Sequence, residues 1–163
     1  MANDLVISLD TMGGDKAPEM IIRGASIARI RMPEVHYLMV GDEARLAPLL
    51  ERDPDLAAVS SIRHTEDVIS SGEKPSVALR SGRNSSMRLA INAVADGEAA
   101  SVVSAGNTGA LMAIAKFVLK TLPGIDRPAI TAFYPTQQGE ACMFDLGANL
   151  QCDAKNLVQF AVM

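Results

Sequence analysis

The segment Val103–Leu111 constrains the fold of this chain more than any other stretch. It leads from an apolar strand pattern at 99–103, through a turn of small residues, into an apolar helix pattern at 110–119. Such a turn exposes backbone N–H groups at a helix N-terminus, where unpaired donors and partial positive charge favour an anion such as phosphate. An ordinary tight turn capped by Ser104 or Asn107 accounts for the same residues. This segment alone leaves both interpretations open.

Two further apolar runs close on polar, glycine-containing segments. The run 5–9 is followed by 10–15, which contains Gly13-Gly14, and a helix pattern then begins near Pro18, a residue well placed in a first helical turn. The glycine pair permits close approach of another molecule. The run at 143–149 ends on Asp, Gly and Asn. Because ligands of open α/β sheets bind at the carboxyl ends of strands, the three segments predict one site along an edge of a parallel sheet.

Strand and helix patterns alternate along the chain, which predicts an α/β fold with a mostly parallel sheet. Asp42 and Asp153 are expected to be helix N-caps, and Pro48 to kink or divide its helix. The last two strands are too close for a helical crossover, so we expect an antiparallel hairpin and a partly mixed sheet. The expected strands lie near 4–9, 35–40, 59–64, 99–104, 129–134 and 141–146, and the expected helices near 18–31, 42–52, 75–96, 108–121 and from 153 onward.

Composition excludes several classes of function. The net charge is −4 and no block of Lys and Arg occurs, so nucleic acid is not an expected partner. No apolar run approaches the roughly 20 residues of a membrane-spanning helix, and the N-terminus has no signal-peptide pattern, which favours a cytoplasmic location. His36 and His64 lie in strand patterns, and neither forms zinc-like spacing with Cys142 or Cys152. We therefore expect no metal, and we expect Cys142 to be part of the core.

Taken together, these segments resemble the phosphate acyltransferases of bacterial phospholipid synthesis. The resemblance covers essentially the whole chain, in order and with the spacing of that family. It implies a layered α/β/α, Rossmann-like fold of the isopropylmalate dehydrogenase-like kind. The motifs that carry it are 10–15 (DTMGGD), 85–88 (SSMR), 104–112 (SAGNTGALM), 127–129 (RPA), 145–149 (DLGAN) and Cys152-Asp153.

The resemblance also implies an activity. A fatty acyl group would pass from acyl carrier protein to inorganic phosphate, giving acyl phosphate, by direct attack of bound phosphate on the thioester and without a cofactor. A homodimer and loose peripheral association with the inner face of the membrane are implied as well. Members of the family are longer, and 156–163 is typical of a helix in progress. We therefore expect 1–163 to be the N-terminal α/β part of a longer enzyme.

The candidate site residues come from these motifs. Unpaired carboxylates would repel phosphate, so we expect the aspartates to pin the glycine loops through backbone N–H groups or to pair with a Lys or Arg outside this chain. A general base is the alternative role. The catalytic candidates are Asp10, Asp15, Asn107, Asp145 and Asn149. The phosphate-binding candidates are Gly13, Gly14, Arg88, Ser104, Gly106, Asn107, Thr108, Gly109 and Gly147.

The polar segment 65–75 is long for a compact domain, and long ordered loops are often functional. It leads into a predicted helix with Arg80, Arg83 and Arg88, where a solvated basic face competes with contacts to phosphate or to an acidic carrier protein. The Cys152 thiol could accept an acyl group, but no histidine is near it in sequence to activate it.

Two other functions stay open. The first is a different enzyme on a related fold, either a coenzyme A-dependent phosphate acetyltransferase or a dehydrogenase, although no G-x-G-x-x-G follows the first strand. The second is a non-catalytic phosphate-binding or scaffold domain. Bound NAD or faster turnover of acetyl-coenzyme A would favour the first, and anion binding without turnover would favour the second.

Overall fold

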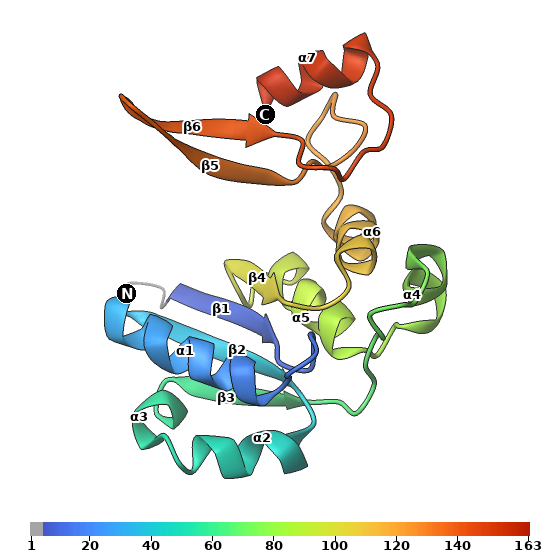
Figure 1. Ribbon diagram of the computed structural model, residues 1–163. Helices are drawn as coiled ribbons and strands as arrows, with labels where there is room; N and C mark the ends of the chain where they lie inside the picture. Colours follow the sequence, from blue (N-terminus) through green and yellow to red (C-terminus); the bar gives the residue numbers. More distant parts are fainter. Residues whose placement is uncertain (1–4) are drawn as a thin grey trace. The chain divides into compact units, whose positions relative to one another are not determined.

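The computed structural model describes residues 5–163, which fall into two compact units divided after Leu119. The first unit is described from Leu5 to Leu119, and the second comprises Lys120–Met163 (Figure 1). Both combine strands with helices, so the predicted α/β class is confirmed. Along residues 5–163, no helix combines the length and apolar character needed to cross a membrane.

The first unit is built on a four-stranded sheet in which every pair of neighbouring strands is parallel. The strand order is β3-β2-β1-β4, so β1 lies in the interior of the sheet between β2 and β4. Asp10, the last residue of β1, pairs in register with Val40 and with Ser104. The carboxyl ends of these strands therefore meet at one edge. The strands are β1 (Leu5–Asp10), β2 (Val35–Gly41), β3 (Ser60–His64) and β4 (Ser101–Ser104).

Helices cover both faces of this sheet, because side chains of a strand alternate between its faces. In β2, Tyr37 and Met39 belong to the core cluster formed with α1, α2 and α3, whereas Leu38 and Val40 pack with Ala90 and other residues of the α5 side (Figure 1). A third buried cluster joins α4, α5 and α6. The helices are α1 (Glu19–Arg31), α2 (Glu43–Leu50), α3 (Pro54–Ala57), α4 (Pro75–Ser81), α5 (Ser86–Ala95) and α6 (Thr108–Leu119).

One helix predicted as continuous is interrupted, and one short helix was not predicted. The pattern at 42–52 gives α2, capped as predicted by Asp42, and Pro48 lies inside α2 without dividing it. The short helix α3 follows beyond the predicted range and is capped by Asp53. The pattern at 75–96 breaks between α4 and α5, where Gly82 is a poor helix former and the Ser85 hydroxyl accepts the N–H of Arg88 as an N-cap.

The second unit contains an antiparallel hairpin followed by a helix. The strands β5 (Thr131–Thr136) and β6 (Gly139–Phe144) pair as predicted, and α7 (Ala154–Val162) begins at the predicted cap Asp153. The hairpin forms its own two-stranded sheet, however, rather than joining a mixed one. The third polar strand end, at Asp145, is therefore not part of the parallel sheet, which corrects the expectation of one shared edge.

The burial of Cys142 was also predicted wrongly, since its side chain is exposed. Nearly every residue of β5 and β6 is exposed, because this two-stranded sheet has no tightly packed second layer among the described residues. An apolar strand pattern indicates a buried strand only when another layer covers the sheet. His64, by contrast, has a structural contact, since its Nδ1 accepts the backbone N–H of Glu43 at 3.1 Å.

Candidate functional site

The ends of β1 and β4 bring the first two glycine-containing turns into contact. A Cβ added to Gly13 would lie 2.9 Å from the backbone nitrogen of Gly106 and 2.5 Å from Asp10 Oδ2, so only glycine fits there. Gly14 has a φ of +102° and lies against Ala105. Two motifs about 90 positions apart in the sequence therefore form one closely packed pair of turns, as the strand-end argument predicted.

Asp10 is buried beneath these turns, with 1% of its surface exposed. Its Oδ1 accepts a 2.6 Å hydrogen bond from the Ser86 hydroxyl, and its Oδ2 accepts one of 2.6 Å from the Ser104 hydroxyl. Ser104 Oγ in turn accepts the backbone N–H of Gly106 at 3.1 Å. We call these four residues the Asp10 network. Asp10 thus acts on the second glycine turn through a hydroxyl, whereas the sequence argument expected a direct bond to backbone N–H groups.

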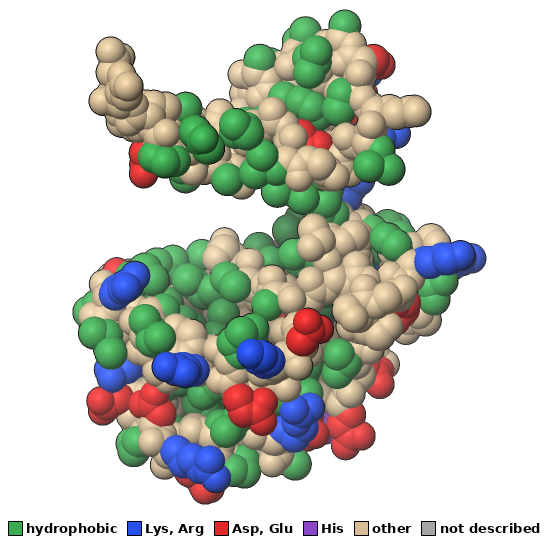
Figure 2. Space-filling model, in the orientation of Figure 1, with side chains coloured by type: hydrophobic (Ala, Val, Ile, Leu, Met, Phe, Trp, Pro, Cys, Tyr) green, Lys and Arg blue, Asp and Glu red, His purple; other side chains and the backbone are tan. Residues whose placement is uncertain are grey.

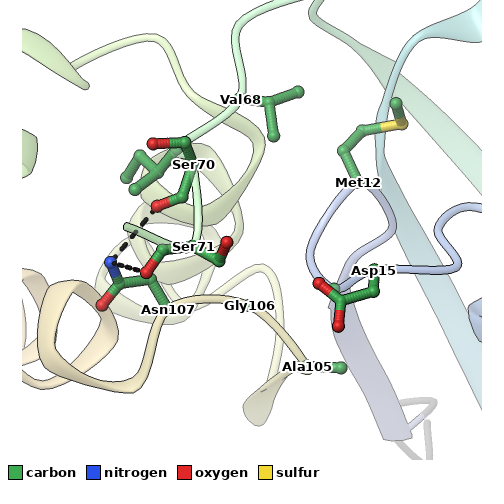
Figure 3. Close-up of a pocket in the computed structure, with 10 residues that line it drawn as sticks. Met12, Asp15, Val68, Ser70, Ser71, Ala105, Gly106 and Asn107 are labelled. Carbon is green, nitrogen blue, oxygen red and sulfur yellow. Dashed lines mark hydrogen bonds between the residues drawn. The ribbon is translucent and has the colours of Figure 1, made fainter. Parts of the chain in front are cut away.

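Asn107 joins the second turn to the loop between β3 and α4. Its Nδ2 donates to the backbone carbonyl oxygens of Ser70 and Ser71 at 3.2 and 3.0 Å (Figure 3). It also donates to the carbonyl oxygen of Glu73 at 2.8 Å. Its Oδ1 accepts the N–H of Ala110 at 3.0 Å, so Asn107, and not Ser104, caps α6. Both ends of this amide are therefore occupied by protein groups. Asn107 shapes the site and has no free donor hydrogen for a ligand.

A cavity of about 470 Å³ lies between the two turns and this loop (Figure 3). We call it the turn cavity. Asp15 supplies the only charged side chain among the described residues that line it, and α6 begins beside it at Thr108. The N–H groups in the first turn of a helix have no intrahelical partner, so this end of α6 attracts anions. The cavity is lined by Met12, Gly14, Asp15, Val68, Ile69, Ser70, Ser71, Ala105, Gly106 and Asn107.

The remaining phosphate-binding candidates of the first unit have different positions. Thr108 and Gly109 form the first turn of α6, and a Cβ on Gly109 would lie 2.8 Å from Pro75 Cγ. Arg88 does not line the turn cavity. It follows Ser86 by two residues, about 200° around the axis of α5, and so it points away from Asp10. Its Nε donates to Asn92 Oδ1 at 3.2 Å, and its guanidinium lies 5.5 Å from the centroid of the Phe117 ring.

The third glycine turn is held by the Asp145 carboxylate within the second unit. Oδ1 accepts the backbone N–H groups of Ile130 and Ala148 at 2.9 and 3.2 Å, and Oδ2 accepts both the N–H and the side-chain amide of Asn149 at 2.7 and 3.0 Å. Gly147, between them, has a φ of +85°. This geometry is the backbone pinning proposed for the aspartates.

Opposing effects act on the pKa of Asp145. Burial is the largest and raises the pKa, but the hydrogen bonds from Ile130, Asn149 and Ala148 together outweigh it and hold the pKa below its ordinary value of 3.8. Asn149 Nδ2 also donates to the carbonyl of Pro128 at 3.2 Å. The hydrogen bonds therefore favour the ionised form of Asp145, which holds this turn in place. The side-chain amide of Asn149 donates to groups of the second unit itself.

Cys152 follows this turn and is exposed, with its Sγ 3.8 Å from the carbonyl oxygen of Asn149. Both histidines of the sequence belong to the first unit. Neither thiol has a hydrogen-bonded base among the described residues. Across residues 5–163, no group of three or more His, Cys, Asp or Glu side chains is arranged to hold a metal ion.

Several residues of the site are not among those predicted from the sequence. Ser86 belongs to one of the resembling motifs, but only the fold brings it to Asp10, 76 positions away. Ser70 and Ser71 lie in the long polar segment 65–75 and line the turn cavity. The unusual length of this segment is the sequence feature that pointed to a functional role.

Comparison with known proteins confirms the resemblance found in the sequence. Residues 5–163 match the model of a family described as fatty acid synthesis protein. The chain is 69% identical over its whole length to a phosphate acyltransferase of Rhodospirillum centenum and 59% identical to one of Rhodospirillum rubrum. It spans about half the length of these relatives, 46% and 47% respectively.

A solved structure shows the same fold at low identity. The EutD phosphotransacetylase of Staphylococcus aureus matches 98% of this chain and 51% of its own, with a TM-score of 0.65 and 21% identity. The layered α/β architecture is therefore shared with a known enzyme fold.

Proposed function

The chain belongs to the fatty acid synthesis protein family, and we propose that it carries the phosphate-binding part of a phosphate acyltransferase that uses acyl carrier protein as acyl donor. The observation that carries the proposal is the turn cavity, where two glycine turns meet beside the N-terminus of α6. The names of the relatives support phosphate as the acyl acceptor.

Inorganic phosphate is proposed to bind at the first turn of α6, against the 105–107 backbone. The unpaired N–H groups of this turn would hold its oxygens, and the Ser70 and Ser71 segment would form the opposite wall. The Asp10 network would hold the 105–107 backbone in place through Ser104 and Gly106. Asn107 would hold the opposite wall in place through its hydrogen bonds to the loop before α4. Positioning of this kind accounts for much of the acceleration in reactions between two bound substrates.

The proposed reaction needs no cofactor. A phosphate oxygen attacks the carbonyl carbon of the thioester, the C–O bond forms, and the carbonyl oxygen becomes an oxyanion held by N–H donors. The intermediate then expels the carrier's thiolate, which takes up a proton, and leaves acyl phosphate. Asp15, exposed at the edge of the turn cavity, is proposed to accept the remaining proton of phosphate as it attacks.

The role of Asp15 is tested by Asp15→Asn. A general base predicts a lower kcat with a pH profile that loses its acidic limb. A carboxylate that only repels the anion predicts the opposite result, a lower KM for phosphate with kcat unchanged, and would overturn the assignment.

The activity is tested by incubating palmitoyl-acyl carrier protein and radiolabelled phosphate with this chain and with a version extended to the length of its relatives. Labelled acyl phosphate from either protein supports the proposal. Absence of product from both, with folding confirmed by circular dichroism, would contradict it and favour a non-catalytic phosphate-binding role. Faster turnover of acetyl-coenzyme A would favour the acetyltransferase alternative.

Dimerisation, membrane association and cytoplasmic location remain predictions, which light scattering, vesicle flotation and cell fractionation would test.

A further inference from the structure

Three arginines gather around a second cavity of the first unit. This cavity has a volume of about 530 Å³ and is walled by α4, the link to α5, α5 itself and α6. We call it the arginine cavity. The described residues that line it include no carboxylate and are Leu79, Arg80, Arg83, Arg88, Asn92 and Phe117.

The positive charge of this cavity is not neutralised within the described residues. Ion pairs among the described residues join Arg29 to Asp55, Arg63 to Glu98 and Lys155 to Asp126, and none of these three pairs includes a residue that lines the arginine cavity. Within residues 5–163, Arg80 donates to the carbonyl of Ser76 at 3.1 Å and Arg88 donates to the neutral side chain of Asn92. On the face shown in Figure 2, by contrast, basic and acidic side chains are interspersed over the first unit. A chain of net charge −4 thus concentrates unpaired cations at one place.

The arginine cavity also has an apolar component. Phe117 is 63% exposed, and the Arg88 guanidinium lies over its ring, 5.5 Å from the centroid. Exposed aromatic residues beside arginines are typical of the central residues of protein interfaces. The combination fits an acidic protein surface better than a small anion, because a small anion has no apolar group to pack against the exposed ring.

The arginine cavity shares an element with the turn cavity. Asn107, at the start of α6, lines the turn cavity, and Phe117, ten residues further along the chain, lines the arginine cavity. Ten residues of helix correspond to about 15 Å. In addition, α4 packs on α6, and the loop that precedes α4 forms a wall of the turn cavity. A partner bound at the arginines would therefore stand close to the site of phosphate binding.

We propose that the arginine cavity is the docking site of the acyl carrier protein that delivers the acyl thioester to the turn cavity. This inference rests on the proposed function. Acyl carrier proteins are strongly acidic, so their carboxylates complement Arg80, Arg83 and Arg88, and complementary charge accelerates encounter and fixes orientation. The carrier holds its thioester at the end of a flexible prosthetic arm, which can extend along α6 from one cavity to the other.

Binding of fluorescently labelled palmitoyl-acyl carrier protein to the 163-residue chain provides the first test. The variant R80E/R83E changes two exposed arginines of the cavity, and R23E/R52E makes the same charge change at exposed positions of α1 and the segment after α2. We expect R80E/R83E to raise Kd about tenfold or more and to weaken or reverse the salt dependence of binding, with the Kd of R23E/R52E within about twofold of that of the parent chain. Equal affinities of the two variants, or no binding by the parent chain, would overturn the inference.

Kinetics separate docking from the reaction itself. In the version extended to the length of the relatives, R80E/R83E should raise KM for palmitoyl-acyl carrier protein about tenfold. It should leave KM for phosphate and turnover of palmitoyl-coenzyme A, which has no carrier protein, unchanged. An equal loss with both donors would assign the arginines to the reaction site and overturn docking. If no donor yields acyl phosphate, the proposed function fails, whereas the binding measurement still decides whether the carrier docks here.

Discussion

Asp10 Oδ2 accepts a 2.6 Å hydrogen bond from the hydroxyl of Ser104, a residue 94 positions further along the chain. Parallel pairing of β1 with β4 places the two residues opposite one another, and the same hydroxyl accepts the N–H of Gly106. Asp10 is buried and does not line the turn cavity, and its two oxygens accept hydrogen bonds from Ser86 and Ser104. A carboxylate can therefore lie near a proposed phosphate site, because its charge is directed to two hydroxyl donors, and it stabilises the second glycine turn through Ser104.

Ser86→Ala tests the Asp10 network. The substitution removes the donor to Asp10 Oδ1 in a buried environment, so we expect the free energy of unfolding to fall by about 1–3 kcal/mol. We also expect a higher KM for phosphate, because the second glycine turn loses part of its support. Urea unfolding and steady-state kinetics measure the two effects. Ser81→Ala, at an exposed serine of α4, is the control and should change stability by less than about 0.5 kcal/mol. Equal stability of the two variants would contradict the role of Ser86.

Gly13→Ala tests the contact between the two turns. The new Cβ would lie 2.5 Å from Asp10 Oδ2 and 2.9 Å from the nitrogen of Gly106, so the turns must separate. We expect a loss of about 1–3 kcal/mol of stability and of most acyl phosphate formation. Gly24→Ala is the matched control, because no described residue places an atom within 4 Å of its Cβ position in α1, apart from its chain neighbours and the helix backbone. Replacing a helical glycine with alanine should stabilise the chain by about 0.5–1 kcal/mol. If the melting temperature of Gly13→Ala rose as that of Gly24→Ala is expected to, the two turns would not be in close contact.

The sequence predicted the first unit well because its signals are local. Apolar runs of strand length, glycine-containing turns and Asp caps each depend on neighbours in the chain, and they correctly located β1, β4 and α6. The pairing of the Asp10 and Ser104 strand ends followed from the general rule on parallel sheets. The partners of Asp10 could not be predicted in this way, because Ser86 reaches it only through the packing of α5 on β1.

Elsewhere the outcome depended on tertiary context, which the sequence does not give. Arg88 is predicted from its motif to bind phosphate, but its angular position on α5 places its guanidinium over the Phe117 ring and outside the lining of the turn cavity. Cys142 has an apolar strand pattern around it, yet its two-stranded sheet leaves it exposed. Asp145 directly follows the strand β6, and that strand belongs to a separate hairpin. The missing information was which layer each element packs against.

Asp145 should make stability depend on pH in the acidic range. Its pKa is lowered in the folded chain, so between the folded and unfolded values the unfolded chain binds more protons. Its contribution is therefore complete above the unfolded pKa of about 3.9 and is lost as pH falls through the folded value. Carboxyl NMR titration should give a pKa below 3.8 for Asp145. Urea unfolding from pH 6 to pH 2 should show a shallower pH dependence for Asp145→Asn than for the parent chain.

Asp53 provides the internal comparison for that experiment. The pKa of Asp53 is also lowered, mainly by the hydrogen bond from the Ser26 hydroxyl. Asp145→Asn leaves Asp53 and this hydrogen bond in place. The pH dependence that remains in Asp145→Asn therefore includes the contribution of Asp53. An unchanged slope after the substitution would mean that the hydrogen bonds to Asp145 do not favour its ionised form.

Asn107 combines two functions, and two substitutions separate them. Asn107→Asp keeps an oxygen that can cap α6 but loses the amide hydrogens bound to Ser70, Ser71 and Glu73. Asn107→Ala loses both the cap and these contacts, and should cost about 1–2 kcal/mol in stability. Because a carboxylate would face three carbonyl oxygens, we expect faster hydrogen exchange in loop 65–74 of the Asp variant, with α6 still protected.

Phosphate binding shows which of the two functions matters to the site. If the loop must stay attached to form the wall of the turn cavity, both variants should raise KM for phosphate by a similar factor, although only Asn107→Ala exposes the start of α6 to exchange. A KM for phosphate that rises in Asn107→Ala alone would mean that the cap, and therefore the order of the helix N-terminus, matters more than the loop. Since Asn107 has no free donor hydrogen, either result places its effect on the shape of the cavity.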